Sequence, residues 1–375
     1  MDKNLFIIWV TTFVTMLGVG FIAPIIPIYA QTLGATNFEI GLIFGSFALA
    51  RTLTQVPVGI LSDIYGKKFF IVSGTFFYGL FTLLYNFVNT VFDLLIVRAL
   101  TGAFSSFVTP VAGSYVAAIA PKDRLGEYMG IFNSAITLGF GVGPFIGGTL
   151  ADIYGIKTPF YFCGFLGILA AIISYTKLED IKFKKENCDK ISLEFLKNKN
   201  FLYSFIINTS NVMMNAGIIT YLGIYTIKYG ISIAQIGSMI AGTNLLMAAL
   251  QRSFGKLYDK LGKVVIIFGI CIASCGVYFL SLSSSFWKIM FSLATVAIGI
   301  SMCSPATTSI AVKDIPPYRK GGAMGIFTTS INIGMFLGSV FFGFLADIFG
   351  ISGMFKASAM FSIIVGFICY LKIRE

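Results

Sequence analysis

The chain has 375 residues, of which 57% are hydrophobic and 11% are charged, and its mean hydropathy is +0.87. Because soluble proteins carry about 25% charged residues, this composition argues against a soluble fold and indicates a protein embedded in lipid. There is no histidine, and the six cysteines lack the spacing of a zinc site or a disulfide framework. We therefore expect neither a metal site nor a cofactor, and no secreted disulfide scaffold.

Twelve apolar runs follow one another along the chain, each near the roughly 20 residues that a helix needs to cross a bilayer. They cover 5–30, 39–60, 69–88, 92–119, 128–149, 158–176, 201–227, 232–254, 264–283, 286–310, 323–345 and 355–372. The first run is too long for the apolar region of a signal peptide and lacks a convincing cleavage site, so we expect a retained helix. The sequence thus predicts an all-α membrane protein with twelve transmembrane helices.

The basic residues are distributed unevenly between the two sides of the membrane. If both termini are cytoplasmic, 21 of the 27 Lys and Arg residues lie in cytoplasmic segments and four lie in outer loops. This asymmetry follows the positive-inside rule and predicts a multi-pass protein of the cell membrane. It also accounts for the net charge of +11 through loops that face anionic lipid, so no nucleic-acid partner is expected.

The two halves of the chain resemble each other. The polar segment 177–200 separates residues 1–176 from residues 201–375, and we expect it to be a cytoplasmic linker between two six-helix bundles. A shift of 196 matches 12 of 40 positions from Ile28 to Lys67, and a shift of 195 matches 15 of 32 positions from Arg124 to Gly155. The tetrapeptides MGIF and LADI recur in the second segment. A parallel six-plus-six repeat is an architecture of secondary transporters, whose substrate site lies between the halves near the middle of the membrane.

A glycine- and lysine-rich turn stands between the second and third apolar runs of each half. It reads Gly59-Ile-Leu-Ser-Asp63-Ile-Tyr-Gly66-Lys67-Lys68 in the first half and Gly255-Lys-Leu-Tyr-Asp259-Lys-Leu-Gly262-Lys263 in the second. Physically, the glycines would permit a tight turn and close helix approach. The turn resembles the GxLaDrxGrk signature of the major facilitator superfamily, except that Ile64 replaces a basic residue. The resemblance covers nearly the whole chain and implies that Asp63 latches the helix over 39–60 against the helix over 323–345.

Three further patterns resemble exporters of this superfamily. The run over 128–149 contains Gly139, Gly143, Pro144, Gly147 and Gly148, which is similar to the GxxxGPxxGG signature of exporters. Small residues at this spacing allow close helix packing, and the proline bends the helix. The second half keeps Gly338 but has Ser339 at the proline position. Leu17-Gly18 followed by Pro24 and Pro27, and Arg98 followed by Gly102, resemble patterns of twelve-helix drug:proton antiporters, in which the arginine is tied to proton transfer.

Two arginines lie within apolar runs, and an intramembrane charge marks function by default. Arg98 is a candidate for coupling, with snorkelling to the interface as the alternative. Arg51 either lines the cavity or hydrogen-bonds a carbonyl. No acidic residue lies deep in a run: Glu39 and Asp93 stand at outer helix ends, and we expect Asp63, Asp152, Asp259 and Asp347 in loops. A cavity with two arginines and no acid would favour neutral or anionic substrates, and proton coupling would have to use Glu39, Asp93 or an Asp63-linked network.

Polar side chains within the apolar runs are candidates for the substrate cavity. Asn208, Asn211 and Asn215 share one helix face, and they face either the cavity or a neighbouring helix. The full set of candidates is Tyr29, Asn133, Asn208, Asn211, Asn215, Tyr221, Tyr225 and Asn244.

These features predict a secondary active transporter that moves small organic molecules across the membrane by alternating access, as a monomer, by proton-coupled efflux. An importer or uniporter for sugars or organic anions with the same fold is the alternative. A membrane-embedded enzyme or a non-transporting receptor is a third hypothesis. The enzyme is disfavoured because there is no histidine, no buried acid pair and no nucleophile beside a base. A primary pump is disfavoured because the chain has no GxxxxGK[ST] phosphate loop.

Overall fold

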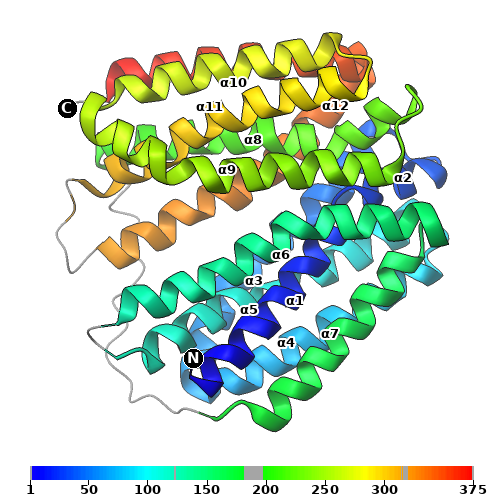
Figure 1. The fold of residues 1–375 in the computed structure, drawn as a ribbon, viewed down its shortest axis with the longest axis vertical. Coiled ribbons are helices and arrows are strands. Elements are labelled where there is room, and N and C mark those ends of the chain that lie inside the picture. Colours follow the sequence, from blue (N-terminus) through cyan, green and yellow to red (C-terminus); the bar gives the residue numbers. More distant parts are fainter. Residues whose placement is uncertain (1, 122–123, 181–196, 314, 316–319, 374–375) are drawn as a thin grey trace. The chain divides into compact units, whose positions relative to one another are not determined.

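The computed structural model describes residues 2–121, 124–180, 197–313, 315 and 320–373 (Figure 1). These residues form helices and contain no strand, which confirms the all-α fold. The helices are α1 (Lys3–Ile22), α2 (Ile25–Thr32), α3 (Asn37–Tyr65), α4 (Lys67–Leu84), the short 3-10 helix η1 (Tyr85–Phe87), α5 (Val91–Ile119), α6 (Leu125–Tyr154), α7 (Thr158–Lys177), α8 (Lys199–Ile227), α9 (Ile233–Leu261), α10 (Val264–Leu282), α11 (Phe286–Lys313) and α12 (Lys320–Lys372).

The helices follow the twelve apolar runs with two differences. The first run forms α1 and α2 because the chain turns at Ala23–Pro24, where the proline has no N–H to donate. The last two runs are continuous in α12, which is interrupted at Gly350 by the non-helical angles φ 69° and ψ 166°. Ten helices of the described chain are long and apolar enough to span a membrane. The helix α8 falls short of that hydropathy because it carries four asparagines.

The chain forms two compact units, and each includes the start of one helix whose remainder belongs to the other unit. Unit 1 contains Met1–Ala35, Ser46–Cys188 and Ser232–Ala241, and unit 2 contains Thr36–Gly45, Asp189–Ile231 and Gly242–Glu375. Thus α3 begins in unit 2 and ends in unit 1, whereas α9 does the reverse. The boundary predicted at 177–200 falls largely on residues 181–196, outside the described residues.

The helices of the two units pair in corresponding ways. In unit 1, α1 packs on α6 and α7, and α4 packs on α5 and α7; in unit 2, α8 packs on α12 and α11, and α10 packs on α11 and α12. Two equivalent tyrosines make the repeat visible at atomic detail. The hydroxyl of Tyr29 donates to the carbonyls of Tyr85 (3.3 Å) and Val88 (3.1 Å). The hydroxyl of Tyr225 donates to those of Ser281 (3.2 Å) and Ser283 (2.9 Å).

Candidate functional site

A cationic and aromatic cluster lies in the interior of unit 1. Arg98, on α5, is only 1% exposed, and its guanidinium carbon lies 4.4 Å from the centre of the Phe47 ring. This is a cation–π contact, which gains strength when water is excluded. Tyr85 is a second partner of the guanidinium, and the Tyr85 hydroxyl lies 3.0 Å from that of Thr101. The described partners of the guanidinium are therefore two aromatic side chains.

The second intramembrane arginine stands beside this cluster. Arg51 follows Phe47 by one helical turn on α3, and its Nε is buried without a hydrogen-bond partner among the described residues. No Asp or Glu of the described chain is buried. The two arginines therefore make this part of unit 1 positive, because the described chain has no buried carboxylate.

Glu39 and Asp93, the two carboxylates predicted from the sequence as candidates for proton coupling, accept hydrogen bonds at the starts of helices. The Oε2 of Glu39 accepts from the Thr36 amide (2.8 Å) and hydroxyl (3.0 Å) at the start of α3. Asp93 and Thr90 form a reciprocal capping box at the start of α5. Both groups therefore satisfy amides that would otherwise lack partners.

The glycine-rich turns have the expected backbone. Gly66 and Gly262 adopt φ values of 100° and 62°, the left-handed region that favours glycine. A methyl group at Gly59 would meet no atom within 4 Å, and one at Gly255 would meet only Pro305 at 3.9 Å. No described residue of its own unit therefore crowds either glycine, and the close helix approach at Gly59 and Gly255 stays a prediction. The carboxylate of Asp63 pairs with Lys67, whose side chain is 6% exposed, and the structure shows no such pair between Asp259 and Lys263 among the described residues.

The placement of four aspartates in loops is also wrong. Asp63, Asp152 and Asp259 each lie two residues before the last residue of α3, α6 and α9, and Asp347 lies three residues before the break in α12. The helices continue past the apolar runs because their polar ends reach water.

Asp152 and Asp347 form two equivalent junctions that sequence analysis missed. At the α6–α9 junction, the Asp152 carboxylate accepts from the amides of Ile233 (3.0 Å) and Ala234 (2.8 Å). At the α12–α3 junction, the Asp347 carboxylate accepts from the amides of Asn37 (3.0 Å) and Phe38 (2.9 Å). Each carboxylate thus caps the first turn of a helix that is distant in sequence, where the helix dipole attracts negative charge. The recurrence of LADI was the signal that could have found them.

Close backbone packing accompanies each cap. A methyl group at Gly237 would overlap the Pro144 carbonyl at the α6–α9 junction, and one at Gly41 would overlap the Ser339 carbonyl at the α12–α3 junction. The Ser339 carbonyl also accepts from Tyr221 (2.9 Å), whose hydroxyl lies equally close to the Asn37 carbonyl. Pro144 and Ser339, which differ between the halves, therefore occupy equivalent contacts.

The other exporter-type glycines seat α6 against α1. A methyl group at Gly139 would lie 2.8 Å from the Phe13 carbonyl, one at Gly143 would lie 2.7 Å from the Leu17 carbonyl, and one at Gly147 would lie 2.6 Å from the Phe21 Cα. Gly148 faces the Ile233 carbonyl at the α6–α9 junction. The small residues therefore mediate the close packing that their spacing predicts.

The polar cavity candidates divide into buried and accessible groups. Tyr29, Tyr221 and Tyr225 use their hydroxyls on carbonyls within their own units, and the Asn208 amide donates to Ser330 (2.7 Å). Asn211 is buried beside Cys303. Asn133 is exposed, and Asn215 and Asn244 are partly exposed. Accessible amides within membrane-spanning helices are costly against lipid, so these three are the stronger candidates for a water-filled path.

Comparison with known proteins identifies the family. The Major Facilitator Superfamily model matches residues 8–328 and 204–375. The chain belongs to the major facilitator superfamily. It is 72% identical to an uncharacterized MFS-type transporter of Methanocaldococcus jannaschii, over 100% of this chain and 99% of the relative. It is 27% identical to the quinolone resistance protein NorA of Staphylococcus aureus, over 93% of this chain and 91% of NorA.

Solved structures of the superfamily share the fold at low identity. A bacterial homologue of the human lysosomal transporter Spinster superposes with a TM-score of 0.88 at 16% identity, over 99% of this chain and 96% of that one. The nucleoside transporter NupG superposes with a TM-score of 0.79 at 14% identity over the whole of both chains. Membership in this family confirms a multi-pass membrane transporter rather than an enzyme.

Proposed function

We propose that this transporter exports small organic molecules across the cell membrane by alternating access, with both termini cytoplasmic and inward proton movement as the driving force. The observation that carries export is the stretch Gly139–Gly148, which seats α6 against α1 and meets α9 at Gly237. The similarity to NorA, a quinolone resistance protein, supports the same direction.

The cluster around Arg98 supports a preference for neutral or anionic substrates. A cation entering a site near Arg51 and Arg98 would meet two like charges, and no buried carboxylate of the described chain would compensate them. We propose Arg98 and Arg51 as coupling residues, with Asn133, Asn215 and Asn244 lining the path.

The test uses purified protein in proteoliposomes with an imposed pH gradient and an internal pH dye. Anionic, neutral and cationic compounds are added in turn. We expect neutral or anionic compounds to collapse the gradient and cationic ones to leave it intact. Collapse by cations alone would contradict the substrate class, and equilibration of labelled compound without proton movement would identify a uniporter instead.

Two variants separate coupling from binding in the same assay. Arg98→Gln removes the charge, and we expect gradient-driven flux to fall at least tenfold while exchange of labelled substrate continues. Phe47→Leu removes the ring contact but keeps the charge, and we expect it to retain most of the coupled flux. Equal flux in Arg98→Gln and the wild type would assign Arg98 a purely structural role.

A further inference from the structure

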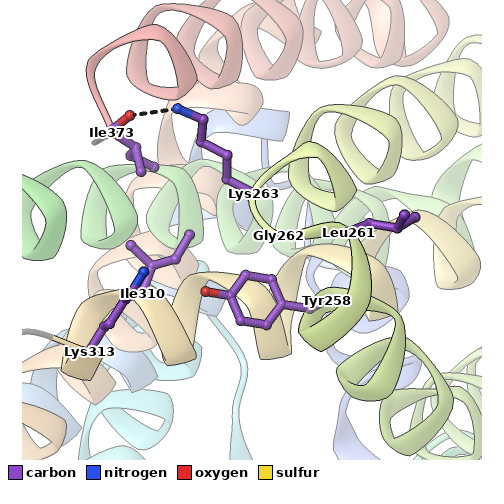
Figure 2. Close-up of a pocket in the computed structure, with 7 residues that line it drawn as sticks. All are labelled: Tyr258, Leu261, Gly262, Lys263, Ile310, Lys313 and Ile373. Atoms are coloured by element: carbon purple, nitrogen blue, oxygen red, sulfur yellow. Dashed lines mark hydrogen bonds between the residues drawn. The ribbon is translucent and has the colours of Figure 1, made fainter. Parts of the chain in front are cut away.

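A basic pocket lies at one end of unit 2, where four helices begin or end (Figure 2). Its volume is about 360 Å³, and its lining comes from the ends of α9, α11 and α12 and the turn before α10. The lining residues are Tyr258, Leu261, Gly262, Lys263, Ile310, Lys313 and Ile373. Two of these are cationic and none is acidic.

The floor of the pocket belongs to a packed core. Ile310 and Ile373 are 4% and 3% exposed and join a hydrophobic cluster with Ile266, Ile270 and Cys369. In Figure 2 the hydroxyl of Tyr258 points from α9 toward α11, on which Ile310 and Lys313 lie. The pocket walls are therefore set by helix packing.

Positive charge converges on this pocket from three sources. The ammonium of Lys263 donates to the Ile373 carbonyl (3.1 Å) and lies 5.6 Å from the centre of the Tyr370 ring, so it reaches the pocket with further donors to offer. Lys313 is exposed at the end of α11. The N-terminus of α10 has no side-chain cap and no acidic residue in its first turn, and the positive end of the helix dipole there attracts anions.

The equivalent position in unit 1 is the turn before α4, where carboxylates of the chain lie close to the positive charge. Lys67, the counterpart of Lys263, is paired with Asp63. A methyl group at Gly66 would lie 3.2 Å from the Asp180 carboxylate, so this carboxylate stands at the start of α4. Within the described part of unit 2, no carboxylate lines the corresponding pocket, and Lys263 turns away from Asp259 toward α12. Among the described residues, the start of α4 in unit 1 thus carries its own carboxylates, whereas the pocket at the start of α10 in unit 2 has none in its lining.

The surroundings of the pocket suit a lipid. The pocket lies at the ends of membrane-spanning helices, where lipid headgroups are found, and its lining residue Leu261 is 53% exposed. α10 and α12 pack on each other and carry exposed apolar side chains along their lengths, at Phe268, Ile364, Ile368 and Leu371. Basic pockets between helix ends bind lipid phosphates in other membrane proteins.

We propose that the pocket lined by Lys263, Lys313 and Tyr258 binds the phosphate group of an anionic membrane lipid, with its acyl chains along the exposed face of α10 and α12. This site is separate from the transported substrate, and the proposal does not depend on the direction of transport. Its phosphate would supply a negative charge to Lys263 and Lys313, which no described carboxylate of the pocket lining does.

The experiment measures lipid retention by native mass spectrometry of the purified full chain in detergent. The probes are phosphatidylglycerol, phosphatidylcholine and inorganic phosphate. We expect phosphatidylglycerol to bind at least fivefold more tightly than phosphatidylcholine. Lys313→Gln should weaken phosphatidylglycerol binding about fivefold, which is the effect of one basic residue at an anionic surface, and Lys263→Gln should do the same.

Lys288→Gln is the matched control. Lys288 is the one lysine in the described lining of a mainly apolar pocket of about 450 Å³ at the opposite ends of α10 and α11, so its removal should leave lipid retention unchanged. Lys313 is exposed, and the melting temperature of Lys313→Gln verifies that the variant folds. Unchanged phosphatidylglycerol binding in both pocket variants would overturn the proposal. Displacement of the lipid by equimolar inorganic phosphate would overturn the lipid assignment in favour of a free phosphate site.

Discussion

At the scale of single residues, the glycines of α6 differ sharply in what surrounds them. A methyl group at Gly143 would lie 2.7 Å from the Leu17 carbonyl and 2.9 Å from the Gly20 Cα, whereas one at Gly130 would meet no atom within 4 Å. The same substitution on the same helix should therefore have opposite effects. At Gly143 the added methyl group would collide with backbone atoms of α1. At Gly130 there is room for a methyl group, so only the helix propensity of the residue changes.

We expect Gly143→Ala to lower the free energy of unfolding by about 1–3 kcal/mol, since α1 must move away from α6. Gly130→Ala should raise it by up to about 1 kcal/mol, because alanine is the better helix former. Thermal denaturation of the purified variants measures both. If the two substitutions shift the melting temperature equally, the close packing of α6 on α1 does not govern stability.

Arg98 shows how much of a single position can be read from sequence. Its charge within an apolar run identified it as important, but its contact with the Phe47 ring joins residues 51 positions apart. No local pattern encodes such a pair. Gly102, one turn after Arg98, lies against the Phe47 backbone, where a side chain would not fit. Helix packing therefore accounts for the glycine that follows the arginine.

At the scale of helices, the starts of α3 and α9 are each held by an aspartate from a distant helix. The two caps are chemically alike but independent, because they lie in different compact units. Each carboxylate satisfies two amides at once, and an amide side chain offers only one oxygen for that purpose. Substitution by asparagine therefore tests the cap with little change in size.

We expect Asp152→Asn to speed hydrogen exchange of the first turn of α9 about fivefold, a change that corresponds to roughly 1 kcal/mol of local stability. The first turn of α3 should exchange at the wild-type rate. Asp347→Asn should produce the converse pattern, so each variant is the control of the other. Uniform acceleration across both helices would show global destabilisation instead of the loss of one cap.

At the scale of the whole molecule, hydropathy predicted the helices well because the bilayer demands about 20 apolar residues for each span. The breaks at Pro24 and Gly350 follow from the backbone restrictions of proline and glycine. The internal repeat was also visible, since equivalent contacts such as those of Tyr29 and Tyr225 preserve the residues that make them.

The candidate site was predicted less completely, for physical reasons. Hydropathy marks where lipid ends but not where a helix ends, so Asp152 and Asp347 were placed outside the helices whose ends they occupy. The sequence does not tell whether a tyrosine or an asparagine lines a transport path or hydrogen-bonds a group within its own unit. The structure distinguishes them through contacts such as that of Asn208 with Ser330.

The exchange of helix starts between the compact units has a consequence for how the protein is made. Residues 232–241 complete unit 1 and residues 36–45 complete unit 2, so neither half of the gene encodes a finished unit. We expect fragments 1–188 and 189–375, expressed separately, to be degraded, because the buried carbonyls and glycines at each junction would lose their partners. Expressed together from two plasmids, they should assemble and transport. Accumulation of either fragment alone at the level of the intact chain, measured by immunoblotting of membranes, would show that a single half matures without its complement.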